Sequence, residues 1–384
     1  MAVEPPLSIG SSHSAPVQLA PVSAAAKVRL QGVEAGRGVA ALLVVLYHAA
    51  LHVEGDVPGS APVLWGLPHF GHAGVDFFFV LSGFIISFVH RGDVGRPERL
   101  GHYLERRFTR VLPFYWLVLC FSLLDTWLLH RAQFPGVCDV ISNVLLLPQA
   151  KDQIVGGAWT LVFELMFYLV FAIAICSRRI GAVVLCAWAA LVAAGLFLNP
   201  SSESAALVVA SSPFCIEFFL GIGAAGLLSR RTVPFSGVLL TIGLTGFALA
   251  GLCEVAGRLY GFGATARLAY GTCSLMVILA LVERERSGRL KVPRFMALLG
   301  RASYSVYLVH LIAIGITFKF LSMALQLTPS WSFPVWAFLC AMGLAAGILA
   351  SVWVEQPVIR YVRTRVFGAR TKAASQGDGQ PGNG

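Results

Sequence analysis

Charged side chains are scarce in this sequence. Only 12% of its 384 residues are Asp, Glu, Lys or Arg, whereas 57% are hydrophobic. A soluble domain usually carries about twice that charged fraction. The shortage therefore excludes an ordinary soluble domain. Many apolar runs also approach the ~20 residues that a helix needs to cross a hydrocarbon core of ~30 Å.

Several motifs of soluble enzymes are also absent. The eight cysteines show no CxxC or Cys/His ligand spacing, so we expect no metal site. No GxGxxG or GxxxxGKS/T phosphate loop follows a predicted strand, and the sequence has no GxSxG serine nucleophile. Cys138 and Cys253 fall near predicted outer loops, and the sequence leaves open whether they pair.

The two ends of the chain differ from its middle in composition. The first 26 residues are rich in Ser, Pro and Ala and lack a basic segment followed by an apolar core. We therefore expect a disordered tail there rather than a signal peptide. The polar ending SQGDGQPGNG predicts the same. The expected organisation is a cytoplasmic tail at 1–29, one membrane domain at 30–365 and a second cytoplasmic tail at 366–384.

Ten apolar runs predict ten transmembrane helices. An even number places both termini on the same side of the membrane. The expected fold class is an all-α polytopic membrane protein, a bundle of about ten transmembrane helices with both termini cytoplasmic. The predicted spans are approximately 34–53, 72–90, 111–129, 158–176, 180–198, 206–228, 235–253, 264–282, 302–325 and 333–354.

The basic residues indicate how these helices are oriented. Of the 29 Lys and Arg residues, 24 lie near the helix ends that an alternating path places on one side of the membrane. The positive-inside rule makes that side cytoplasmic. It also explains the net charge of +10 without a nucleic-acid partner. The opposite side holds only Arg131, Lys151, Arg258 and Arg267.

The first predicted helix carries an arginine and a histidine in an otherwise apolar run, GRGVAALLVVLYH. Arg37 and His48 are separated by about three helical turns, so they share one face roughly 16 Å apart. Ionisable residues inside a membrane are costly, and they default to a functional hypothesis. The plainer alternatives are that Arg37 only orients the helix and that His48 is hydrogen-bonded within the bundle.

Two carboxylates are expected at a depth similar to that of His48. Asp76 lies near the outer end of the second span, and Glu164 lies a turn or two inside the outer end of the fourth. Carboxylates beside a histidine can orient it and hold it basic. We therefore predict a cluster of these three residues, although Asp76 could also sit at the interface with its carboxylate in water.

A second group of polar residues is cytoplasmic. The stretch HYLERRFTRVLPFYW brings Arg106, Arg107 and Arg110 to the start of the third span. Arginine clusters suit phosphates because guanidinium groups form bidentate, charge-assisted hydrogen bonds. Anionic lipid headgroups are an equally good explanation on this stretch alone. For Glu217 and His310, which lie within apolar spans, a structural role is favoured.

Five stretches together resemble the acyltransferase-3 family of bacterial inner-membrane acyltransferases. The resemblance runs from about residue 30 to 365, and its first two stretches are similar to the branch that acetylates exopolysaccharides or lipo-oligosaccharides. The stretches are Arg37…His48, GVDFFFVLSGF at 74–84, RRFTR at 106–110, WTLVFELMFY at 159–168 and SYSVYLVH at 303–310.

The resemblance implies the transfer of an acyl group, commonly acetyl from acetyl-CoA, to a hydroxyl of an envelope or secreted glycan or glycolipid. It implies no permanently bound cofactor, a place in the bacterial inner membrane among its lipids, and polysaccharide biosynthesis or export machinery as a candidate partner. The matching positions implied as functional are Arg37, His48, Arg107 and Arg110, with Glu164 added.

A mechanism follows for such a protein. The phosphates of coenzyme A would dock on the cytoplasmic arginines, including Arg106, with Arg37 near the entrance. His48 would be the general base on the acceptor hydroxyl or a transient carrier of the acyl group. Asp76 or Glu164 would fix its tautomer and stabilise the imidazolium.

Two other classes of protein stay open from the sequence. A proton-coupled secondary transporter could use His48, Asp76 and Glu164 as a proton relay. A non-catalytic subunit of a polysaccharide export assembly could use the same helices for contact alone. The cytoplasmic arginine cluster favours an anionic cytoplasmic donor and hence the enzyme.

Overall fold

The computed structural model of the chain describes residues 30–129, 131–198 and 204–367. These residues form helices joined by short connections, with no strand among them. The predicted all-α class is therefore confirmed. The tails predicted at 1–29 and 366–384 lie outside the described residues, apart from 366–367.

The helices follow the ten predicted spans closely. Within the described ranges, nine helical segments are long and apolar enough to cross a membrane, and a bent pair would make ten if it forms one span. The principal helices are α1 (Gln31–Asp56), α2 (Gly74–His90), α3 (Leu100–Leu129), α4 (Val137–Val144), α5 (Trp159–Cys176), α6 (Arg178–Leu198), α7 (Ala205–Ser211), α8 (Phe214–Arg230), α9 (Ser236–Val255), α10 (Ala264–Arg286), α11 (Arg294–Ala324), α12 (Ser332–Ala350) and α13 (Gln356–Val362).

Shorter helical segments connect several of these helices. They are the 3-10 segments η1 (Val63–Ala73), η2 (Pro97–Arg99), η3 (Arg131–Gln133), η4 (Gly156–Ala158) and η5 (Pro329–Trp331), and the π-helical segments η6 (Ser351–Glu355) and η7 (Arg363–Phe367).

Two of the predicted spans differ from the helices in ways that matter for the site. The sixth span, 206–228, is not one helix but the pair α7 and α8, bent by 42°. Pro213 stands at the break, where its ring and missing N–H prevent the first helix from continuing. The third span begins earlier than expected, at Leu100, so the RRFTR stretch lies within α3.

Hydrogen bonds join the helix ends that carry most of the basic residues. Both carboxylate oxygens of Glu285, near the end of α10, accept the backbone N–H groups of Gln31 and Gly32, which start α1. Such groups lack partners within their own helix, so the carboxylate caps α1. Arg91, after α2, donates to Ser229 near the end of α8 at 2.9 Å. We call this side of the bundle the basic end.

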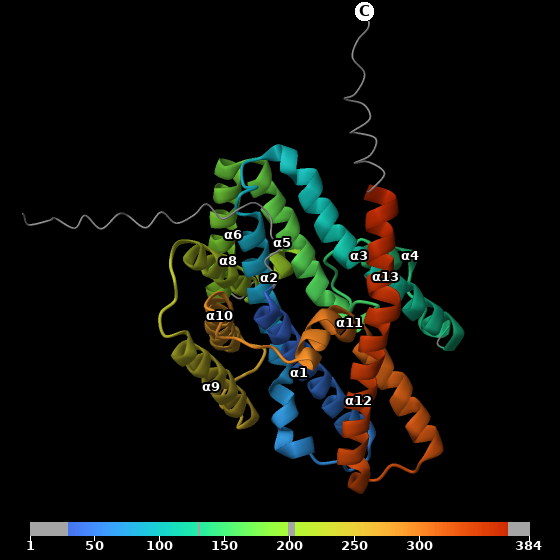
Figure 1. The fold of residues 1–384 in the computed structure, drawn as a ribbon. Coiled ribbons are helices and arrows are strands. Elements are labelled where there is room, and N and C mark those ends of the chain that lie inside the picture. The colour runs from blue at the N-terminus through green and yellow to red at the C-terminus, as the bar shows by residue number, and fades with distance from the viewer. Residues whose placement is uncertain (1–29, 130, 199–203, 368–384) are drawn as a thin grey trace, which may run out of the picture. The chain divides into compact units, whose positions relative to one another are not determined.

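Close packing fixes α2 between its neighbours α1, α5, α8 and α10 (Figure 1). A Cβ atom added to Gly221 of α8 would lie 2.1 Å from the carbonyl oxygen of Val80, and one added to Gly83 of α2 would lie 2.2 Å from that of Phe218. Glycines let two helix backbones approach this closely, which is how helices associate in a membrane without a hydrophobic driving force. The register of α2 is therefore set by backbone contact.

This contact predicts that Gly221→Ala destabilises the protein. The new methyl group must displace the α2 backbone, and overpacking of this kind costs about 1–3 kcal/mol. Thermal unfolding of the purified protein in detergent measures the loss. Gly223→Ala, on the same helix with nothing within 4 Å of its Cβ position, is the matched control and should unfold like the wild type. Equal melting temperatures for both variants would contradict the packing.

Candidate active site

Two adjoining pockets lie inside the bundle. The first, here called the arginine pocket, is lined by Arg37, Ser82, Arg107, Arg110, Glu164 and Tyr168 among others. The second, the histidine pocket, is a cavity of about 280 Å³ lined by Tyr47, His48, His72, Arg267 and His310 among others. A buried water needs only about 10–15 Å³ of such space, so this cavity has room for part of a ligand. Val75 and Tyr307 line both pockets.

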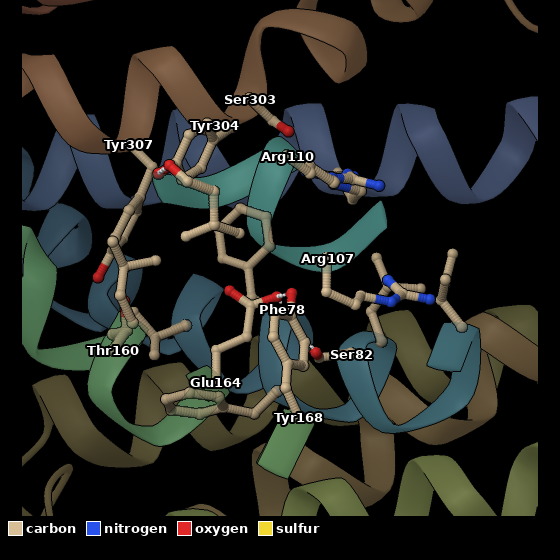
Figure 2. Close-up of a pocket in the computed structure, with 17 residues that line it drawn as sticks. Phe78, Ser82, Arg107, Arg110, Thr160, Glu164, Tyr168, Ser303, Tyr304 and Tyr307 are labelled. Atoms are coloured by element: carbon tan, nitrogen blue, oxygen red, sulfur yellow. Dashed lines mark hydrogen bonds between the residues drawn. The ribbon is translucent and has the colours of Figure 1, made fainter. Parts of the chain in front are cut away.

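The arginine pocket concentrates positive charge. Arg107 and Arg110 lie one turn apart on α3, and Arg37 enters from the first turns of α1. The guanidinium carbon of Arg107 lies 5.7 Å from the ring centre of Tyr168, an arrangement in which the aromatic face stabilises the cation. Figure 2 shows Arg107 and Arg110 at one end of the pocket and Tyr307 at the other. Three guanidinium groups beside a single carboxylate suit an anionic ligand.

Glu164 is the carboxylate of the arginine pocket. It accepts a hydrogen bond from the Tyr168 hydroxyl and a longer one, at 3.4 Å, from Ser82. The predicted contact between Glu164 and His48 is therefore wrong, because the two residues line different pockets. Two side chains at the same depth in the membrane can still point in different directions, because the rotation of each helix about its axis is independent of depth.

Arg106 does not line the arginine pocket. It is exposed, whereas its neighbour Arg107 is 8% exposed. Successive residues on a helix point about 100° apart, so one of an adjacent pair faces inward and the other outward. A role for Arg106 in binding phosphate stays a prediction.

The histidine pocket brings His48 and His310 into contact. Nδ1 of His48 lies 3.2 Å from Nε2 of His310, and the ring centres are 4.9 Å apart. Nδ1 of His310 faces the Val306 carbonyl at 3.1 Å and must donate to it, so Nε2 is its acceptor. Nδ1 of His48 then carries the proton, which it also directs at the Val44 carbonyl at 2.9 Å. The lone pair of His48 is left on Nε2.

Register explains why these two histidines meet. A Cβ atom on Gly38 of α1 would lie 2.8 Å from the backbone nitrogen of Gly300 in α11, so the two helices touch there. His48 and His310 each follow ten residues later, on helices that run in the same direction. Sequence reasoning favoured a structural role for His310. Its place in the SYSVYLVH stretch was the signal that pointed to the site.

Asp76 also lies away from His48, contrary to the predicted cluster. Its carboxylate forms an ion pair with Arg267 of α10, with Nη1 and Oδ2 separated by 2.5 Å and the side chains 0% and 1% exposed. The preceding residue, Val75, faces both pockets, so the next position along α2 is turned towards α8 and α10. Arg267 thus links Asp76 to the histidine pocket.

Sequence reasoning counted Arg267 among the basic residues of the outer side and gave it no part in the site. It lies in the first turn of α10, where it is buried, and it lines the histidine pocket. The guanidinium lies 4.7 Å above the Phe214 ring and donates to the Gly261 carbonyl. Its Nε atom has no hydrogen-bond partner among the described residues. A fixed cation therefore lines the pocket that holds the histidines.

These pockets place an anion-binding surface next to a pair of histidines inside a membrane bundle, an arrangement suited to transfer from an anionic donor. Comparison with known proteins gives the class directly. A family model described as an acyltransferase domain matches residues 30–352. The chain belongs to this family, acyltransferase-3, and is a multi-pass membrane O-acyltransferase. The transporter and the non-catalytic subunit are therefore set aside.

Three known proteins are similar in sequence to this chain. The exopolysaccharide production protein ExoZ of Rhizobium meliloti is 28% identical over 316 residues, which cover 77% of this chain and 92% of ExoZ. The acyltransferase MdmB of Streptomyces mycarofaciens is 25% identical over 378 residues, 88% of this chain and 94% of MdmB. Protein 2 in the picA locus of Rhizobium radiobacter is 29% identical over 160 residues, 35% of this chain and 77% of that protein. No solved structure matches the chain.

The ion pair predicts that Arg267→Met destabilises the protein strongly. Removing one partner of a buried pair leaves an uncompensated charge and costs about 3–5 kcal/mol. Thermal unfolding in detergent should show this loss, and the double variant Asp76→Asn/Arg267→Met should lose less than the two single variants added together. Arg258→Met, at an exposed position, serves as the control. Strict additivity in the double variant would contradict the pairing.

Proposed function

We propose that this chain transfers an acyl group, acetyl in the simplest case, from cytoplasmic acetyl-CoA to a hydroxyl of an envelope or secreted glycan or glycolipid. The observation that carries the proposal is the pair of adjoining pockets. Arg37 and His48, on one face of α1, line one pocket each, and Val75 and Tyr307 line both. A molecule that is anionic at one end can therefore lie in the arginine pocket and present its other end to the histidines.

The donor would enter at the basic end, which the positive-inside rule makes cytoplasmic. Arg37, Arg107 and Arg110 would bind the phosphates of coenzyme A, with Arg106 at the outside of the same helix. The pantetheine arm is long enough to carry the thioester inward, past Phe78, whose ring packs edge-on against Tyr307 at 5.8 Å. The thioester would then meet His48.

His48 would perform the transfer in one of two ways. As a general base, its Nε2 takes the proton of the acceptor hydroxyl while the oxygen bonds to the acyl carbon and the carbon–sulfur bond breaks. As a carrier, the same nitrogen bonds to the acyl carbon first and releases it to the acceptor afterwards. His310 supports either role because it fixes the proton of His48 on Nδ1. Arg267 can stabilise negative charge on the carbonyl oxygen.

The acceptor is proposed from the relatives and from topology. ExoZ is named for exopolysaccharide production, and the histidine pocket lies towards the end of the bundle opposite to the basic end. A glycan or its lipid-linked precursor on the outer side of a bacterial inner membrane fits this position. Polysaccharide biosynthesis or export machinery would be the natural neighbour of such an enzyme.

The function predicts a mass difference in the glycans of the producing cell. Envelope and secreted glycans from cells with the protein should be heavier by one acyl group at the modified position than those from cells without it. Cells that carry His48→Ala at normal protein levels should match the cells without it, because general-base or nucleophilic catalysis is lost. Mass spectrometry measures both comparisons, and full acylation with His48→Ala would refute the central assignment.

The two-pocket arrangement also predicts separable defects. Arg37→Ala should weaken binding of acetyl-CoA, since a lost charge-assisted contact of ~1.5–3 kcal/mol corresponds to about a 10- to 150-fold higher Kd. His48→Ala should leave the Kd nearly unchanged while transfer stops. Titration of the purified protein with acetyl-CoA measures this, with the exposed Arg179→Ala at the same end as the control. Equal loss of binding in both variants would contradict the arrangement.

A further inference from the structure

A third histidine lines the histidine pocket and has no role so far. His72 belongs to η1, directly before α2, and is 6% exposed. Its ring stacks on Phe262 with centres 4.5 Å apart and meets Tyr47 edge-on at 5.5 Å. The stacked Phe262 ring covers one face of the His72 ring. Tyr47 also contacts His48 edge-on at 4.8 Å, so the two histidines flank one tyrosine.

A carboxylate holds His72 in one orientation. Glu254, at the end of α9, lies with Oε1 at 2.7 Å from Nε2 of His72. Its other oxygen accepts the Tyr270 hydroxyl at 2.7 Å, which fixes the carboxylate in turn. When His72 is neutral, Nε2 donates to Glu254 and the lone pair lies on Nδ1. When one ring nitrogen of a histidine donates to a carboxylate, the other ring nitrogen is positioned to accept a proton.

The surroundings of His48 are different. Its Nδ1 faces the Val44 carbonyl and the neutral ring of His310, whereas Asp76 and Glu164 form their hydrogen bonds with other residues. A proton gained by His72 is compensated at once by Glu254. His48 has no hydrogen bond to a carboxylate within the described part of the chain. The pocket therefore separates a histidine suited to hold a proton from one suited to act as a neutral nucleophile.

The opening of the histidine pocket supports the same assignment of roles to His72 and His48. Phe262, which stacks on His72, lines the pocket and is also 54% exposed. The pocket thus approaches the surface beside His72, at the end opposite to the basic end. The acceptor would arrive on the side of His72, and the donor on the side of the arginine pocket.

We propose that His72, oriented by Glu254, is the general base that takes the proton of the acceptor hydroxyl, and that His48 carries the acyl group between donor and acceptor. This inference rests on the proposed function and selects one of the two roles left open for His48. In the first half-reaction, Nε2 of His48 bonds to the acyl carbon, the carbon–sulfur bond breaks, and coenzyme A leaves as the thiolate. The proton on Nδ1 of His48 passes to Nε2 of His310.

In the second half-reaction, Nδ1 of His72 accepts the hydroxyl proton while the acceptor oxygen bonds to the acyl carbon. The bond from that carbon to Nε2 of His48 breaks, and His310 returns its proton to Nδ1. His72 then gives its proton to water on its own side, and the thiolate takes one from water at the basic end. Atoms and charges balance, and no further reactant is needed.

The two half-reactions can be measured separately in purified protein in lipid. Exchange of labelled coenzyme A into acetyl-CoA, without acceptor, reports the first. Transfer of labelled acetyl from acetyl-CoA to a glycan fraction from cells lacking the protein reports the second. His72→Gln should keep exchange within about threefold of the wild type and lose transfer by about 100-fold or more, the usual contribution of a general base. Glu254→Gln should show the same split, more weakly.

The chain contains a matched control. His69 lies on the same segment η1 and pairs with Glu54 at 2.8 Å, but it does not line the pocket. His69→Gln should leave both half-reactions unchanged, and His48→Ala should abolish both.

Three results would overturn the inference. They are equal loss of exchange and transfer in His72→Gln, full transfer in that variant, and wild-type transfer without any exchange. If the wild type shows neither reaction with any glycan fraction, the proposed function itself fails.

Discussion

Burial of charge in an apolar bundle is the constraint on which the rest of this structure depends. An isolated ion there is so costly that every buried charge must be paired or neutralised. The Asp76–Arg267 pair satisfies this requirement and also joins α2 to α10. Through its second bond, to the Gly261 carbonyl, Arg267 fixes the segment that holds Phe262 over His72. One ion pair thus positions both a helix contact and a wall of the histidine pocket.

The helix α1 organises the chemistry in a different way. Its parallel contact with α11, made through Gly38 and Gly300, aligns equivalent positions along both helices. Arg37 consequently reaches the arginine pocket and His48 the histidine pocket, with His310 opposite. A donor that cannot cross the membrane and an acceptor on the far side need such a division.

The sequence predicted well how deep each side chain lies in the membrane, but it predicted poorly which neighbouring helix the side chain faces. Hydrophobic runs and basic ends determine how far along a helix a residue lies, which is why the all-α fold and the order of its helices were predictable. A prediction from depth alone placed Asp76 and Glu164 beside His48, but Asp76 pairs with Arg267 and Glu164 bonds to Tyr168. The rotation of each helix about its axis is set by contacts between segments far apart in the sequence, such as the contact of Gly221 with the α2 backbone. A local sequence pattern does not reveal such contacts.

The separate roles of His48 as acyl carrier and His72 as general base have an electrostatic consequence. With a single base, the proton of the acceptor can return directly to the departing thiolate, and no charge crosses the membrane. With a carrier and a separate base, the thiolate is protonated at the basic end while His72 releases its proton at the other. Each transfer then moves one positive charge outward, against a potential that costs about 2.3 kcal/mol per 100 mV. The position of Glu254 beside His72 thus links acyl transfer to the voltage across the membrane.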